Sequence, residues 1–157
     1  MLTVLLGIAA LAVAIGSERY GGLVPCALCL LERWPYRVAI LAGVFAWFAP
    51  RRPARMALAF GVLCFLAAAG LATVHVGVEQ GAWKSPLPEC AAPGFDAAQS
   101  VQQRLASMPA RPAKPCDDPT YLLPGLPVSM AMLNLAYALA SGAIVAMSLA
   151  RSRGRRP

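Results

Sequence analysis

Long apolar segments are the feature that most limits how this chain can fold. Its 157 residues are 59% hydrophobic and only 13% charged, whereas a soluble domain carries about 25% charged residues. At 1.5 Å per residue, the last three segments would reach roughly 33–38 Å as helices, enough to cross a hydrocarbon core of about 30 Å. The sequence therefore predicts an all-α integral membrane protein, a four-helix transmembrane bundle forming a single domain over 1–157, with spans at about 1–16, 26–49, 54–78 and 128–150.

The first apolar segment, 1–16, is shorter than the others and would reach only about 24 Å as a helix. It could extend into residues 17–20, it could be a spanning helix whose start lies upstream, or it could be a signal peptide. No Lys or Arg precedes the apolar run, so the basic beginning of a signal peptide is missing. We expect a retained helix, and a truncated one would leave one wall of the bundle incomplete.

The arginines predict how the segments cross the membrane. Cytoplasmic loops and tails are rich in Lys and Arg, which places both termini in the cytoplasm and the loops 17–25 and 79–127 outside. The net charge of +7 then reflects topology and not binding to nucleic acid. Seven of the fourteen basic residues stand in two short places that contain no acid: Arg51, Arg52 and Arg55, then Arg151, Arg153, Arg155 and Arg156.

Four of the five cysteines form two pairs on the predicted outer side. Cys26 and Cys29 open the second segment, and Cys90 and Cys116 lie in the long polar stretch. Outside a bacterial cell membrane, disulfides form and persist. Cys90 and Cys116 could form a structural disulfide that stiffens the loop, or an exposed redox pair open to a soluble protein; a second pair on the same side favours the redox function. Cys64 lies in an apolar run and is expected to be an inert filler.

The second segment, taken as one helix, gathers reactive and charged groups on one face. Cys26, Cys29, Arg33 and Arg37 fall within an arc of about 80°, and Glu32 points elsewhere. The positive end of the helix dipole and the charge of Arg33 both favour thiolate, the reactive form of cysteine.

Two features of the same segment leave its geometry open. Pro35 frees the carbonyl of Leu31 and could kink the helix or split it in two. The charged residues could also be interfacial anchors of an aromatic belt that includes Trp34 and Tyr36. Such a belt explains the charges, but it does not explain the two cysteines. Ionisable groups inside a span are costly and usually functional, so we favour the functional interpretation.

His75 is expected at the same depth in the membrane as Cys29 and Arg33. Counted from residue 54, it lies about 31 Å along its helix, near the outer surface, which permits a shared pocket. Glu79, one turn later, is expected to face water.

The long stretch 79–127 is expected to be mostly irregular and mobile, because it is polar and rich in proline. A short helix at 96–108 would lie on the membrane surface or stand in solvent. Zinc or an iron–sulfur cluster on the four cysteines is disfavoured, because the second pair lacks metal-ligand spacing and the compartment is oxidising. No metal is therefore expected.

These features together resemble one protein family. The run 25–33, Pro-Cys-Ala-Leu-Cys-Leu-Leu-Glu-Arg, heads the second segment, a cysteine pair lies in the second outer loop, and the run 125–130, Gly-Leu-Pro-Val-Ser-Met, leads into the fourth. With the four segments, this resembles the DsbB family of bacterial disulfide-bond formation proteins over nearly the whole length. The related vitamin K epoxide reductase family places its Cys-x-x-Cys in the last helix, and the last segment here contains no cysteine.

The resemblance implies an inner-membrane thiol oxidase and a direction for the electrons. A periplasmic thiol oxidase of the DsbA type would attack the disulfide between Cys90 and Cys116, with Cys90 forming the mixed disulfide and Cys116 connecting to Cys26. The pair of Cys26 and Cys29 would take the two electrons.

The resemblance also implies a bound quinone as acceptor, either ubiquinone or menaquinone. Cys29 would pass the electrons to it, and Arg33 would hold it and stabilise negative charge. His75 would lie beside it, by its position near the end of the third segment. Two other functions stay open: a membrane scaffold with one structural disulfide, and an exporter of reducing equivalents. The exporter would need an inner thiol pair, and the inner loops contain no cysteine.

Overall fold

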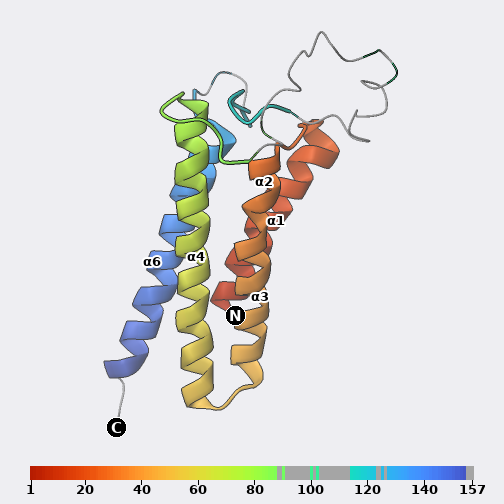
Figure 1. Ribbon diagram of the computed structural model, residues 1–157. Coiled ribbons are helices and arrows are strands. Elements are labelled where there is room, and N and C mark those ends of the chain that lie inside the picture. Colours follow the sequence, from red (N-terminus) through yellow and green to blue (C-terminus); the bar gives the residue numbers. More distant parts are fainter. Residues whose placement is uncertain are drawn as a thin grey trace.

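Helices make up the regular structure of the described part of the chain. The computed structural model describes residues 1–87, 90, 100, 102, 114–122, 125 and 127–154. The helices are α1 (Leu2–Gly21), α2 (Ala27–Leu31), α3 (Arg33–Phe48), α4 (Arg51–Glu79) and α6 (Met130–Gly154). They form a bundle in which α4 packs against both α3 and α6, and α1 packs mainly on α3 (Figure 1).

The predicted helical membrane bundle is confirmed. Among the described residues, α1, α4 and α6 are each long and apolar enough to cross a membrane. Helices α2 and α3 together cover 27–48, roughly 33 Å of helix, and their place as the fourth crossing remains a prediction. The predicted surface helix at 96–108 falls almost wholly outside the described residues.

Helix α1 is longer than the span predicted at 1–16. It continues to Gly21, so its 20 residues reach about 30 Å, and of the alternatives the extension into residues 17–20 is the one observed. The polar residues remain helical because they find partners within the protein: the Ser17 hydroxyl donates to the Ala14 carbonyl at 3.0 Å, and Glu18 pairs with Arg33. The helix ends where Gly22 takes a left-handed conformation, with φ of 65°, a common helix terminator.

The predicted span at 26–49 is two helices and not one. Pro35 lacks the N–H that would bind the Leu31 carbonyl, and α2 ends at Leu31. Glu32 lies between the helices and caps both. Cys26 caps the start of α2, where its sulfur accepts a hydrogen bond from the Cys29 N–H at 3.2 Å.

Small side chains bring the helices close together in the lower bundle. The buried core there consists largely of alanines around Phe65 and Tyr36, and small residues allow close packing of helices in membranes. Cys64 is a buried, free thiol in this core, as expected of a filler. Gly43 of α3 lies against α1, where an added Cβ would come within 2.7 Å of the Val4 side chain and 3.3 Å of the Val4 backbone nitrogen.

Replacing Gly43 by alanine should therefore push α1 away from α3. We expect Gly43→Ala to lower the free energy of unfolding by about 1–3 kcal/mol, the usual cost of overpacking. Gly70→Ala is the matched control, because Gly70 has open space around its Cβ position, and its effect should stay below about 1 kcal/mol. Unfolding by denaturing detergent in mixed micelles measures both, and equal effects would contradict the close contact.

Candidate active site

The first cysteine pair lies at the start of α2 with its sulfurs in contact. The Sγ atoms of Cys26 and Cys29 are 2.8 Å apart and are not bonded. Cys26 is buried and Cys29 is half-buried. The capping bond from the Cys29 N–H stabilises negative charge on the Cys26 sulfur. The two thiols are therefore placed to form a disulfide with little movement of the backbone.

The second cysteine pair is a disulfide that packs against the first. Cys90 and Cys116 are bonded, and they share one buried cluster with Cys26, Leu28 and Val78. Only 4% of Cys90 and 1% of Cys116 is exposed. The expectation that this pair faces water is wrong, because Cys90 and Cys116 themselves pack against the start of α2 and the end of α4. The backbone of Lys114 also forms a bridge with that of Cys26.

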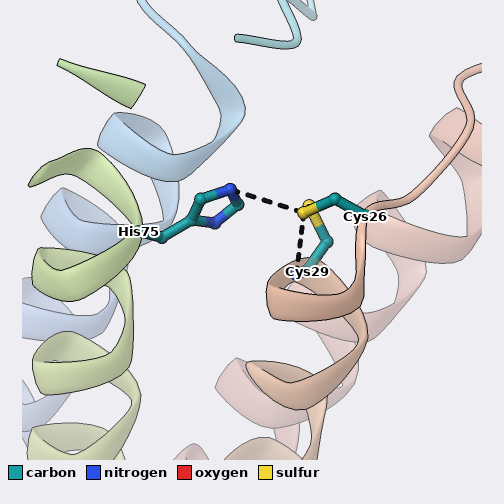
Figure 2. A group of neighbouring side chains, drawn as sticks. All are labelled: Cys26, Cys29 and His75. Atoms are coloured by element: carbon teal, nitrogen blue, oxygen red, sulfur yellow. Dashed lines mark hydrogen bonds between the residues drawn. The ribbon is translucent and has the colours of Figure 1, made fainter. Parts of the chain in front are cut away.

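His75 reaches the same cysteines from α4. Figure 2 shows its ring pointing at the thiols, with Nε2 3.4 Å from the Cys26 sulfur. Its other nitrogen, Nδ1, donates to the Glu32 carboxylate at 2.8 Å. Glu32 was expected to point away from the cysteines. That expectation is wrong, because Glu32 follows Cys29 by three residues and keeps a helical conformation, and positions three apart are neighbours on a helix surface.

The Glu32 carboxylate is also held from α6. Its second oxygen accepts from Asn134 Nδ2 at 2.7 Å, and the Asn134 carbonyl accepts from the Tyr36 hydroxyl at 2.6 Å. A continuous polar chain thus runs from Tyr36 through Asn134, Glu32 and His75 to Cys26. It crosses the bundle between helices and lies almost entirely out of contact with solvent.

Glu79 lies one turn beyond His75, and it does not face water as predicted. Its side chain is 5% exposed, with Oε1 3.9 Å from His75 Nε2. The other carboxylate oxygen accepts a hydrogen bond from the Ser129 hydroxyl, which precedes α6. The end of α4 is therefore closed against the start of α6.

Arg33 is buried beside the cysteines and pairs with a residue from α1. Its two terminal nitrogens both bind the Glu18 carboxylate. Its Nε is buried with no hydrogen-bond partner among the described residues. Arg37, predicted on the same face, is instead exposed and stacks over the Trp34 ring at 5.1 Å. The interfacial-anchor interpretation thus fits Trp34 and Arg37, but not Arg33.

A cavity of about 290 Å³ adjoins these groups. It is lined by the 9–18 stretch of α1 and the first two turns of α6, together with residues of α2, α3 and α4. The Tyr137 hydroxyl of α6 binds the Leu6 carbonyl of α1 at 2.8 Å lower in the bundle. Most of the lining is apolar and comes from α1, the 23–25 stretch, Leu122 and the start of α6. Six other side chains also reach the cavity and bring its thiol and most of its polar groups: Cys29, Glu32, Arg33, Tyr36, His75 and Asn134.

Sequence reasoning identified the cysteines, Arg33 and His75 as neighbours in depth, but it missed the residues that hold them. Glu18, Glu32 and Asn134 make the contacts that fix Arg33 and His75. Two of them carried a usable signal, because an acid within or at the edge of an apolar span is costly and needs a partner. Asn134 carried no such signal, since its position on α6 says nothing of its partner on α3.

Comparison with known proteins identifies the family of the chain. The family model for disulfide bond formation protein DsbB matches residues 1–148. The chain belongs to the DsbB family. No curated protein and no solved structure matches it. As a DsbB-family protein it is a multi-pass protein of the inner membrane that takes part in disulfide formation.

The polar chain through Asn134 should matter for stability in this DsbB-family protein. In Asn134→Leu, Glu32 loses a donor and Tyr36 an acceptor, so we expect unfolding to cost about 1–3 kcal/mol less. Ser148→Ala is the control on the same helix, because that exposed hydroxyl binds only the Ile144 carbonyl one turn earlier, and its effect should stay within about 0.5 kcal/mol. Detergent unfolding again compares them, and an Asn134 variant as stable as the control would contradict the network.

Proposed function

We propose that this protein reoxidises a periplasmic DsbA-type dithiol oxidase and passes the electrons through its two cysteine pairs to a membrane quinone. The observation that carries the proposal is the single buried cluster containing Cys26, Cys90 and Cys116. Cys29 packs against this cluster and also lines a cavity whose walls are largely aliphatic. The arrangement links a loop disulfide to a site within the membrane, and so connects a water-soluble reductant with a lipid-soluble oxidant.

The proposed transfer consists of balanced thiol–disulfide exchanges. A thiolate of the partner attacks Cys90 and displaces Cys116 as a thiolate. Cys116 then attacks Cys26 of an oxidised inner pair and displaces Cys29. The partner's second thiol resolves its mixed disulfide with Cys90, which in turn attacks Cys116 and displaces Cys26. The partner leaves with a disulfide, the outer pair is restored, and Cys26 and Cys29 hold the two electrons.

The cysteines are in the state that this series of exchanges would leave behind. The outer pair is bonded and the inner pair is not. Because Cys90 is almost fully buried, a partner must displace the contacts over it before its thiolate can attack. We therefore propose that docking of the partner opens the outer pair, while the inner pair stays enclosed by α4.

The residues around the cavity fit a quinone. Arg33 offers a buried Nε–H without a partner among the described residues, and it would donate to a ring oxygen. The aliphatic side chains of α1 would hold the isoprenoid part. A quinone bound there supplies an acceptor for two electrons and two protons, which allows the inner pair to return to a disulfide.

The protein's own groups would prepare that step. Both terminal nitrogens of Arg33 donate to the Glu18 carboxylate, so the guanidinium is oriented before any ligand binds. Its charge would act on the cavity that Cys29 lines. His75, oriented by Glu32, favours thiolate at Cys26 when it is protonated. Arg33 beside the cavity, and His75 when it is protonated, would oppose the cost of placing negative charge in a medium of low dielectric constant.

The proposed orientation places the cysteines in the periplasm. Arg51 begins α4 and Glu79 ends it, so the basic turn and the site lie about 43 Å apart along one helix and at opposite ends of the bundle (Figure 1). Basic loops remain in the cytoplasm. The α3–α4 turn and the end of α6 would then be cytoplasmic.

Loss of the inner thiol should abolish quinone reduction. In Cys29→Ser, turnover with a reduced DsbA-type partner should fall by at least about a thousandfold, because the inner pair can no longer form a disulfide or pass electrons to the quinone. Cys64→Ala, which removes a thiol from the apolar core, should retain turnover. Reduction of quinone by purified protein is followed by absorbance. Full activity of Cys29→Ser would refute the proposal, and disulfides that do not change on quinone depletion would favour the scaffold.

Substitution of the two arginines of α3 should change the KM for quinone to very different extents. Arg33→Gln removes the charge that faces the cavity, and we expect the KM for quinone to rise about ten- to a hundredfold, the value of a charge-assisted hydrogen bond. Arg37→Gln is the matched control one turn away, where the side chain is exposed over Trp34. Equal KM values in the two variants would contradict the assignment of Arg33.

A further inference from the structure

The inner cysteine pair and His75 form a cluster with the composition of a metal site. The two sulfurs and a ring nitrogen all lie within 4.8 Å of one another. Figure 2 shows the three side chains directed toward one another. Bonds of 2.3 Å to sulfur and about 2.0 Å to nitrogen place the ligand atoms of a tetrahedral zinc site about 3.5–3.8 Å apart. The distance of 3.4 Å between Cys26 Sγ and His75 Nε2 already fits. The sulfurs, now 2.8 Å apart, would have to separate by about 1 Å, which a small side-chain rotation provides.

The imidazole is oriented as a metal-binding histidine is. His75 Nδ1 donates to Glu32, so in the neutral ring the lone pair of Nε2 is directed at the Cys26 sulfur. A carboxylate behind a histidine is the usual support of a zinc ligand, because it fixes the tautomer and the ring orientation. Asn134 holds the carboxylate in turn. The supporting contacts of a zinc site are thus present before any ion arrives.

A fourth ligand and a favourable charge are also at hand. The Glu79 carboxylate lies 3.9 Å from Nε2, and water could reach the cluster through the cavity that Cys29 and His75 line. With the dithiol reduced and ionised, two sulfurs and two buried carboxylates surround one imidazole. Thiolate and imidazole ligands select zinc over magnesium or calcium, and a divalent cation would offset the buried negative charge.

We propose that the reduced protein binds Zn²⁺ through Cys26, Cys29 and His75, and that zinc and the disulfide are mutually exclusive at this pair. Each thiol loses a proton on binding, and no electron is transferred. While the ion is bound, both sulfurs are engaged and cannot form a disulfide. The sequence disfavoured a metal on four cysteines; this site needs only the inner pair, and its third ligand comes from α4.

The test uses the full chain, without an affinity tag, in lipid nanodiscs. The protein is reduced, freed of reductant without oxygen and titrated with Zn²⁺ against a chromophoric chelator. We expect about one tightly bound ion per chain, and none once Cys26 and Cys29 have been oxidised to a disulfide. Co²⁺ in place of zinc should give the thiolate charge-transfer bands of a tetrahedral site. Equal affinity of the oxidised and reduced forms would overturn the proposal.

Variants then locate the ion. Cys29→Ser and His75→Ala should each lower the affinity by about a hundredfold or more, and Glu32→Gln by about tenfold or more. Reduction also frees Cys90 and Cys116, so a double variant is needed to show that they do not bind the ion. Cys90→Ser, Cys116→Ser should keep the site. If the double variant loses the ion and His75→Ala keeps it, the site lies in the loop and the proposal fails.

A direct signal avoids dependence on how the variants fold. His75 is the only histidine in the chain, so protein labelled with ¹⁵N-histidine has one imidazole to observe. Binding of one equivalent of Zn²⁺ should shift the Nε2 resonance and leave Nδ1 protonated. An unshifted Nε2 resonance in zinc-loaded protein would refute the proposal. None of these measurements uses quinone turnover, so their outcome and that of the proposed function are decided separately.

Discussion

The contact between Glu32 and His75 holds together the part of the bundle on which the site depends. It joins the break between α2 and α3 to the end of α4, and Asn134 extends it to α6. A buried carboxylate is costly unless it is paired and fully hydrogen-bonded, so each of these helices has a fixed register relative to the others. The same contact orients the imidazole toward Cys26. The packing of the helices around the site and the position of the imidazole beside Cys26 therefore both depend on the contact between Glu32 and His75.

Glu32 stands between α2 and α3 and keeps a helical conformation. It follows Cys29 by three residues, and positions three apart are neighbours on a helix surface, so its carboxylate lies on the side of the thiols and reaches His75. Pro35 removes one backbone hydrogen bond, and α2 stands as a separate short helix whose first residues carry the thiols. The Cys-x-x-Cys pair is thus positioned by a turn of helix anchored at both ends and not by a long rigid rod.

Burial of both cysteine pairs in one cluster bears on the transfer proposed between them. An exposed loop pair would have to travel to the membrane pair, whereas here the loop disulfide already packs against it. Exclusion of water protects the reactive sulfurs from side reactions. A partner could reach Cys90 only after the contacts over it open. The inner pair has His75 on one side and the cavity on the other.

Local properties of the chain were enough to predict much of this protein. Apolar length predicted the membrane helices, the spacing of Cys26 and Cys29 predicted thiol chemistry, and distance along the helix placed His75 at their depth. Contacts between helices could not be predicted in that way: the burial of Cys90 and Cys116, the pairing of Glu18 with Arg33, and the inward turn of Glu32. Composition and periodicity act within one segment, whereas the partner of a buried charge lies on another helix, and only the packed bundle decides which one.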